Sequence, residues 1–316
     1  MAYKHLFGPV PSRRLGISLG VDLVPFKVCS FNCIYCEVGA TTNLTLERKD
    51  YVPIDDVIRE LDDYLSHDPE LDYITFSGAG EPTLNSGIGK VIRHIKVMYP
   101  QYKLALITNS SLFYDEELRA EIAKVDLIMP SLDAVSDEVF RKLNRPNAQL
   151  KLFEIIEGLI SFREESKAEM WLEIFFSPGL NDTPTELERL KKACEEIAPE
   201  RIQFNTLDRP GVEAGLQSMT KEQMEDIVEY FKPLPAEIIA KFQSRTLVKS
   251  FDSNIEERIL ETISRRPCTD EDLCSMLGLH INELNKYIFT MLEKGEIKER
   301  REERGTFFEP AEKVSE

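Results

Sequence analysis

Apolar runs of strand length alternate with amphipathic stretches of helix length through the chain. The runs are continuously apolar, which is typical of strands buried on both faces of a parallel sheet. They cover 16–23, 73–77, 103–108, 125–133, 170–176 and 201–206. Apolar residues at three- and four-residue spacing predict helices between them, at 54–66, 86–99, 115–124, 151–164 and 185–197. Six such strands with helices between them predict an α/β fold, a parallel sheet curved into an open or partial barrel.

Polar segments follow these strands at the points where they end. They are the three-cysteine loop 29–36, SGAGEPT (77–83), TNSS (108–111), PSLDA (130–134) and NTLDRPG (205–211). The carboxyl ends of parallel strands lie at one edge of a sheet, which is where such folds carry functional residues. We therefore expect these segments to meet in one site.

Three cysteines, Cys29, Cys33 and Cys36, lie within eight residues. Thiolates at such short spacing suit a cubane iron–sulfur cluster, and three of them leave one iron open for an outside ligand. A zinc site normally needs a second Cys or His pair. The remaining candidates show no paired metal-ligand spacing: Cys194, Cys268, Cys274, His5, His67, His94 and His280. A three-ligand [4Fe–4S] cluster is therefore favoured over a zinc site with a distant fourth ligand or a chance grouping.

The CxxxCxxC spacing, with Tyr35 just before the third cysteine, resembles the signature of radical S-adenosylmethionine (SAM) enzymes. The resemblance covers roughly residues 10–210 and implies a partial (β/α)6 barrel. It implies that Cys29, Cys33 and Cys36 ligate a [4Fe–4S] cluster whose open iron is chelated by SAM. It also implies reductive cleavage of SAM to a 5′-deoxyadenosyl radical that abstracts hydrogen from a substrate. A one-electron reductant such as a flavodoxin or ferredoxin is the implied partner, and no catalytic residue is assigned beyond the cluster ligands.

The turn SGAGEP resembles the GGE motif of the same enzymes, with Ala79 in its middle position. Glycines there let the backbone approach a ligand closely. The resemblance makes Gly78, Ala79, Gly80 and Glu81 candidates for holding the SAM ammonium group. A plain glycine turn is the alternative for residues 78–81. After the next strand, Thr108 and Asn109 are candidates for contact with SAM or substrate.

Further SAM contacts are expected from the later strands. Ser131 and Asp133 are candidates for the ribose hydroxyls or the methionine carboxylate, although a helix cap explains them equally well. Arg145 is a candidate for the carboxylate or a solvated arginine. Glu173 points either into the barrel or outward. The expected adenine pocket is drawn from Tyr35, Phe175, Asn205 and Leu207, with a core position as the alternative for Phe175 and Leu207.

The stretches FGPVPSRRLGISLGVDLVP (7–25) and SLDAVSDEVFRKLNRP (131–146) resemble a radical SAM subgroup related to the tRNA wyosine-synthesis enzymes. Arg13 and Arg14 are candidates for an anionic substrate or a cluster-side group, with solvated arginines as the alternative. The match is partial, because those enzymes carry a second cluster on N-terminal cysteines and no cysteine precedes Cys29 here. Their substrate is not carried over, and a tRNA-modifying activity remains the alternative enzyme function.

The end of the chain is expected to form a second domain. We place a radical SAM barrel with a C-terminal extension at 1–243 and a winged helix at 250–316, built from three helices and a hairpin around Gly305. Ser253 or Asn254 would cap the first helix; Gly278 and Gly295 would end the next two. Residues 251–316 carry ten Lys and Arg against sixteen Asp and Glu, a net charge of −6. A DNA reader is more basic, so a protein, peptide or intramolecular contact is favoured over DNA for this domain. A cluster-containing DNA-binding redox regulator is the alternative to an enzyme, but the SAM-motif residues at several strand ends count against it, because a sensor needs only the cysteines.

Charge and hydropathy indicate what the protein can bind and in which compartment it is expected. The net charge of −17 disfavours broad nonspecific binding of nucleic acid. There is no apolar run near 18 residues, so no membrane span is expected. The amino terminus lacks the apolar core of a secretory signal. The cysteines are clustered without such a signal, which also suits a reducing compartment. We therefore expect a cytoplasmic protein.

Overall fold

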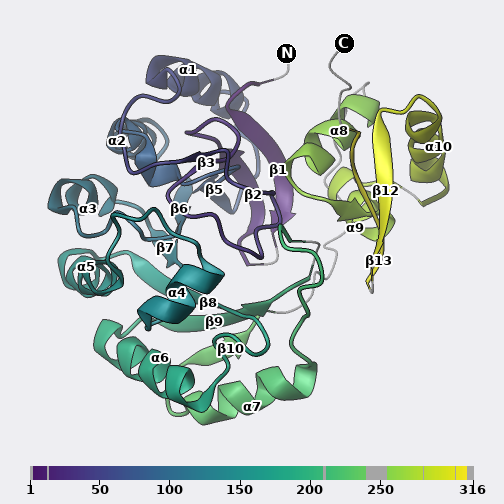
Figure 1. Ribbon diagram of the computed structural model, residues 1–316. Coiled ribbons are helices and arrows are strands. Elements are labelled where there is room, and N and C mark those ends of the chain that lie inside the picture. The colour runs from purple at the N-terminus through teal and green to yellow at the C-terminus, as the bar shows by residue number, and fades with distance from the viewer. Residues whose placement is uncertain are drawn as a thin grey trace.

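An eight-stranded sheet forms the centre of the protein (Figure 1). The computed structural model describes residues 3–12, 14–208, 211–239, 255–279, 281–302 and 304–311. In spatial order the strands are β1 (Leu6–Ser12), β2 (Gly16–Val21), β5 (Tyr73–Phe76), β6 (Lys103–Thr108), β7 (Leu127–Pro130), β8 (Glu169–Phe176), β9 (Arg201–Thr206) and β10 (Ala236–Ile238). β1 runs antiparallel to β2, and all the other neighbours are parallel. The mostly parallel α/β sheet is confirmed.

Helices cover the outer face of this sheet (Figure 1). They are α1 (Ile54–Leu65), α2 (Ile88–Met98), α3 (Glu116–Ile122), α5 (Leu152–Glu165), α6 (Pro184–Ile197) and α7 (Lys221–Phe231). Side-chain caps start several of them: Asp115 caps α3, Thr183 caps α6, and Thr220 forms a capping box on α7. The large core packs between the helices and the outward residues of the strands, such as Leu19, Ile74 and Leu104.

Some elements were not predicted. They are β1, β10, the short pair β3 (Val28–Cys29) and β4 (Asn43–Leu44), the 3₁₀ turn η1 (Pro82–Leu84), α4 (Asp137–Leu143) and β11 (Cys268–Thr269). β1 carries Pro9 and Pro11, which cannot donate to a ladder and so suit an edge strand. β10 has only three residues, too few to give an alternating pattern. Among the described residues, no helix is both long enough and apolar enough to cross a membrane.

The C-terminal unit consists of α8 (Ile255–Arg265), β11 (Cys268–Thr269), α9 (Asp270–Leu277), α10 (Ile281–Glu293), β12 (Ile297–Glu302) and β13 (Gly305–Pro310). β11, β13 and β12 form a three-stranded sheet in that order. The unit has a hydrophobic cluster of its own that includes Ile259, Leu273 and Met291. Gly278 adopts φ 68° at the end of α9, as a left-handed helix stop requires. The expected caps Ser253 and Asn254 lie outside the described residues.

Candidate active site

Alternate residues of the strands face the inside of the curved sheet. A small apolar cluster there contains Leu15, Ala105, Leu127, Met129 and Trp171. Because neighbouring residues of a strand point to opposite faces, these side chains are separated from the core under the helices. Polar and sulfur-bearing groups gather at the carboxyl ends of the same strands, where the predicted segments meet.

The cysteine loop is fastened to the SGAGEP turn by backbone hydrogen bonds. Lys27 N–H donates to the Ala79 carbonyl at 2.8 Å, and Glu81 N–H donates to the Val28 carbonyl at 3.1 Å. A Cβ on Gly80 would lie 2.0 Å from the Val28 carbonyl oxygen. This closeness requires glycine at position 80, so the close backbone approach expected of the motif is directed at the cysteine loop.

Each thiol receives an N–H donor from another side chain. Asn109 Nδ2 lies 3.5 Å from Cys29 Sγ, and Asn144 Nδ2 lies 3.6 Å from Cys33 Sγ. Lys27 Nζ lies 3.0 Å from Cys36 Sγ although the lysine is only 3% exposed. Such donors favour the negatively charged form of sulfur.

Burial works against free thiolates at this site. It raises the pKa of the Cys29 thiol to about 12, and the Glu81 carboxylate adds to the rise. Burial also raises the pKa of Cys33 well above its ordinary value, with the charges of Asp133, Cys36 and Cys29 adding to it. A bound metal centre reverses this balance, because its positive charge deprotonates a coordinating thiol. Three neighbouring sulfurs with N–H donors around them therefore fit an iron–sulfur cluster.

Glu81 is buried and already engaged by four donors. Its Oε1 accepts from Thr83 N–H at 3.1 Å, Thr83 Oγ1 at 2.5 Å and Thr108 Oγ1 at 2.7 Å, and its Oε2 accepts from Asn109 N–H at 2.8 Å. Burial raises the pKa of Glu81, and these donors oppose the rise. Glu81 therefore joins the turns after β5 and β6. Thr108 and Asn109 act through this carboxylate and, for Asn109, through Cys29.

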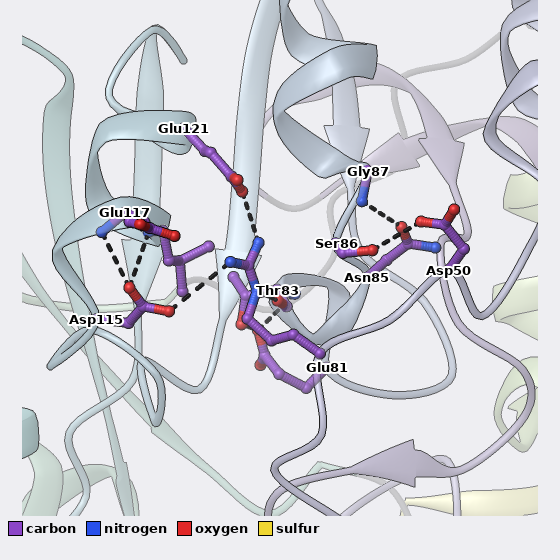
Figure 2. A network of polar contacts seen from close by, with 11 residues as sticks. Asp50, Glu81, Thr83, Asn85, Ser86, Gly87, Asp115, Glu117 and Glu121 are labelled. Atoms are coloured by element: carbon purple, nitrogen blue, oxygen red, sulfur yellow. Dashed lines mark hydrogen bonds and ion pairs between the residues drawn. The ribbon is translucent and has the colours of Figure 1, made fainter.

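Arg48 also holds the turn that contains Glu81, from the side of the helix layer. Thr83, beside Glu81 in η1, offers its carbonyl oxygen to Arg48 Nε at 3.1 Å, and Arg48 Nη2 lies 2.5 Å from Glu121 (Figure 2). The same network reaches Asp115, the cap of α3. The turn is thus tied to the helix layer by charged side chains.

Asp133 is the centre of a second buried network. Its Oδ2 accepts from the Tyr35 hydroxyl and from Asn144 Nδ2, the latter at 2.6 Å, and its Oδ1 accepts from Phe175 N–H at 2.8 Å. Burial raises the pKa of Asp133 to about 6 against the effect of these donors. Tyr35 stacks on Phe175 with ring centroids 3.8 Å apart, which leaves no space between the two rings. An adenine can therefore meet this pair only on an outer face.

Asn144 joins the Asp133 network to the cysteine loop. It contacts Cys33 and Asp133 through its amide nitrogen, while its Oδ1 is buried without a hydrogen-bond partner among the described residues. A buried acceptor without a donor is costly in a folded protein, so this atom suits a ligand that brings an N–H or O–H group beside Cys33.

The remaining predicted residues are more dispersed. Glu173 pairs with Arg14 and accepts from Asn205 Nδ2 at 3.3 Å, so it lies on the inner face with both of them. Arg145 pairs with Glu213 and is 42% exposed in its side chain. Ser131 follows β7 and bridges to Glu173 through its backbone. Leu207 is half-buried after β9, and Arg13 lies outside the described residues.

Sequence reasoning missed four residues that shape the site. They are Lys27, Asn144, Asn181 and Glu186. Asn181 donates to the carbonyl oxygens of Asp133 and Phe175, and Glu186 accepts from the N–H groups of Val135 and Ser136. For Lys27 a signal existed, since a lysine two residues before Cys29 carries a positive charge into the cysteine loop.

Comparison with known proteins identifies the family to which the chain belongs. The profile of the Radical SAM superfamily matches residues 23–197. The chain is 32% identical to UPF0026 protein MJ1312 of Methanocaldococcus jannaschii over 89% of either chain. It is 35% identical to a protein named GTPase Obg from Brachyspira hyodysenteriae over 94% of this chain, but it spans only 44% of that protein's length.

Two solved structures show the same fold. A radical SAM methyltransferase from Sphaerobacter thermophilus superimposes with a TM-score of 0.53 at 18% identity, over 70% of this chain and 65% of its own. SuiB from Streptococcus suis bound to S-adenosylmethionine gives 0.52 at 15% identity, over 72% and 51%. Superfamily members bind a [4Fe–4S] cluster and SAM. The protein is accordingly an enzyme that binds these two cofactors, and it belongs to the radical SAM superfamily.

Proposed function

We propose that this enzyme cleaves SAM reductively and uses the resulting radical to abstract hydrogen from a substrate not yet identified. The observation that carries the proposal is the set of three neighbouring, half-buried thiols, each met by an N–H donor. When bound, the cluster and SAM supply the electron transfer and the 5′-deoxyadenosyl radical. Cys29, Cys33 and Cys36 are the proposed iron ligands.

We assign the other site residues to holding the cysteine loop and orienting SAM. Residues 78–81 keep their backbone against the cysteine loop through Gly80, and Glu81 fixes the turn after β6. Asp133 and Asn144 place polar atoms beside Cys33, where we assign the ribose or methionyl end of SAM. Tyr35 and Asn205 are assigned to the adenine side. Ser131 and Arg145 are retained as peripheral SAM contacts.

Anaerobic reconstitution tests the proposal. The protein should hold about four irons, as a cubane does, and should release methionine and 5′-deoxyadenosine when reduced with dithionite or a flavodoxin. Cys33→Ala should abolish both the cluster and the cleavage. Cys274→Ala, a half-buried cysteine of the C-terminal unit, is the matched control and should retain both. Full cleavage by Cys33→Ala would sink the assignment.

We also propose that residues 250–316 form a winged-helix domain beside a barrel domain at 1–243, and that it recruits or gates the substrate. The order helix, strand, two helices and hairpin supports this. The net charge of −6 over 251–316 favours a contact with protein over DNA. Specific DNA binding by the full-length protein, steeply weakened by salt, would contradict this part of the proposal.

A further inference from the structure

The C-terminal unit contacts the barrel through two arginines. Arg265, at the end of α8, pairs with Asp22, which directly follows β2. Arg304, between β12 and β13, pairs with Asp208, shortly after β9, at 2.9 Å, and with Asp272 of its own unit at 2.6 Å. β2 and β9 are the first and last of the six parallel strands predicted from the sequence. The unit lies beside β1 (Figure 1), and its two arginines meet acidic residues that follow the carboxyl ends of β2 and β9.

The Arg265 guanidinium group lies over the aromatic ring of Phe7. Its guanidinium carbon is 3.7 Å from the centre of the Phe7 ring, a cation–π distance. Phe7 in turn covers Gly20, where an added Cβ would lie 2.0 Å from the ring. Gly20 therefore lets Phe7 lie flat against β2, and Phe7 supports the arginine beside Asp22.

Asp22 connects the contact between Arg265 and Phe7 to the SGAGEP turn. While its Oδ2 pairs with Arg265, its Oδ1 occupies the space where a side chain on Gly78 would begin, 1.5 Å from that hypothetical Cβ. Oδ1 is buried and has no partner in hydrogen-bond geometry among the described residues. The nearby Ala79 N–H still favours the charged carboxylate. Asp22 thus faces the backbone of residues 78 and 79.

The charge on Asp22 depends on Arg265. Burial raises the pKa of Asp22, and the Arg265 charge is the largest influence that opposes the rise. Without the guanidinium, a buried carboxylate would be left unpaired beside the turn, and such a group must take up a proton or move toward water. Either response changes the packing against Gly78.

We propose that Arg265 is a positioning residue for SAM, which acts through Asp22 on residues 78–81 and so couples docking of the C-terminal unit to SAM binding. The inference rests on the proposed function, because it assigns residues 78–81 to SAM. Coupling of this kind is reciprocal: a docked unit tightens SAM binding, and bound SAM holds the unit docked. A partner that displaces the unit from Asp22 would therefore weaken SAM binding, which links radical formation to the docking of the C-terminal unit.

A double-mutant cycle tests the coupling. Arg265→Gln, Asp22→Asn and the double variant are compared with wild type in two measurements. The first is amide hydrogen exchange of residues 78–81 in the ligand-free protein. The second is the SAM dissociation constant of the reconstituted enzyme. Both single variants should speed exchange in the turn and weaken SAM binding by on the order of tenfold. The double variant should be no worse than the weaker-binding single, because the two residues act as one unit.

Matched variants keep the test decisive. Arg300→Gln removes an arginine that pairs with Glu302 in the hairpin, and should behave as wild type. Arg265→Lys keeps the charge without the planar guanidinium, and should fall between wild type and Arg265→Gln. Unchanged exchange and SAM affinity in folded Arg265→Gln, or losses that multiply in the double variant, would overturn the coupling. A wild-type protein that forms the cluster but neither binds nor cleaves SAM would instead overturn the proposed function.

Discussion

The Lys27 ammonium group lies 3.0 Å from Cys36 Sγ, inside the loop that carries the proposed iron ligands. A positive charge beside a cluster sulfur stabilises the reduced cluster more than the oxidised one. Lys27→Met should therefore lower the reduction potential. A charge-assisted hydrogen bond of about 2 kcal/mol corresponds to roughly 90 mV for one electron. A redox titration followed by electron paramagnetic resonance would measure the shift. Lys49→Met, an exposed lysine paired with Glu47, should leave the potential unchanged, and an equal shift in both variants would contradict the role of Lys27.

The strands were predictable because burial on both faces leaves continuous apolar runs, and β6 and β9 begin and end at the predicted residues. The three cysteines proposed as ligands could be recognised as a group because they are close in sequence. The groups that surround them were not. Asn144 is 111 residues from Cys33, and Arg14 is 159 residues from Glu173. Such contacts depend on how the sheet curves, which local spacing does not encode.

Glu81→Gln should weaken both the fold and SAM binding. The carboxylate oxygens accept four hydrogen bonds, so an amide nitrogen in either position would face at least one donor. Leaving a buried donor unpaired costs about 1–3 kcal/mol. We expect a lower melting temperature and slower SAM cleavage at subsaturating SAM. Thr83→Ser keeps the hydroxyl and N–H donors and is the control; if Glu81→Gln melted and bound SAM like this control, the carboxylate would not be structural.

Gly80→Ala should prevent full cluster assembly. The new Cβ would lie 2.0 Å from the Val28 carbonyl oxygen, so the backbone one residue before Cys29 would have to move. Gly39→Ala separates this clash from backbone strain, because Gly39 has φ 103° with open space around it. Iron content after reconstitution should fall well below four per chain in Gly80→Ala and stay near that value in Gly39→Ala. Equal iron in the two variants would show that the close approach is dispensable.

Asp133 should make the stability of the iron-free, reduced protein depend on pH. Its folded pKa of about 6 lies above the ordinary value of 3.8, chiefly because it is buried. Between those values the folded state holds a proton that the unfolded state has released, so stability falls as pH rises through this window. The shift of roughly two pKa units corresponds to about 3 kcal/mol. Urea unfolding from pH 4 to 7 should show this fall relative to Asp133→Asn, and parallel curves for the two proteins would contradict it.

Tyr35→Phe tests whether the Tyr35 hydroxyl lowers the pKa of Asp133. The Tyr35 hydroxyl donates to Asp133 and is the largest of the influences that lower its pKa. Without the hydroxyl, the carboxylate loses a donor while it stays buried against Phe175 and Asn144. The fall in stability should therefore extend to higher pH in Tyr35→Phe than in wild type, measured in the same urea series. A fall that ends at the same pH in both proteins would mean that Tyr35 positions its ring on Phe175 without influencing the charge of Asp133.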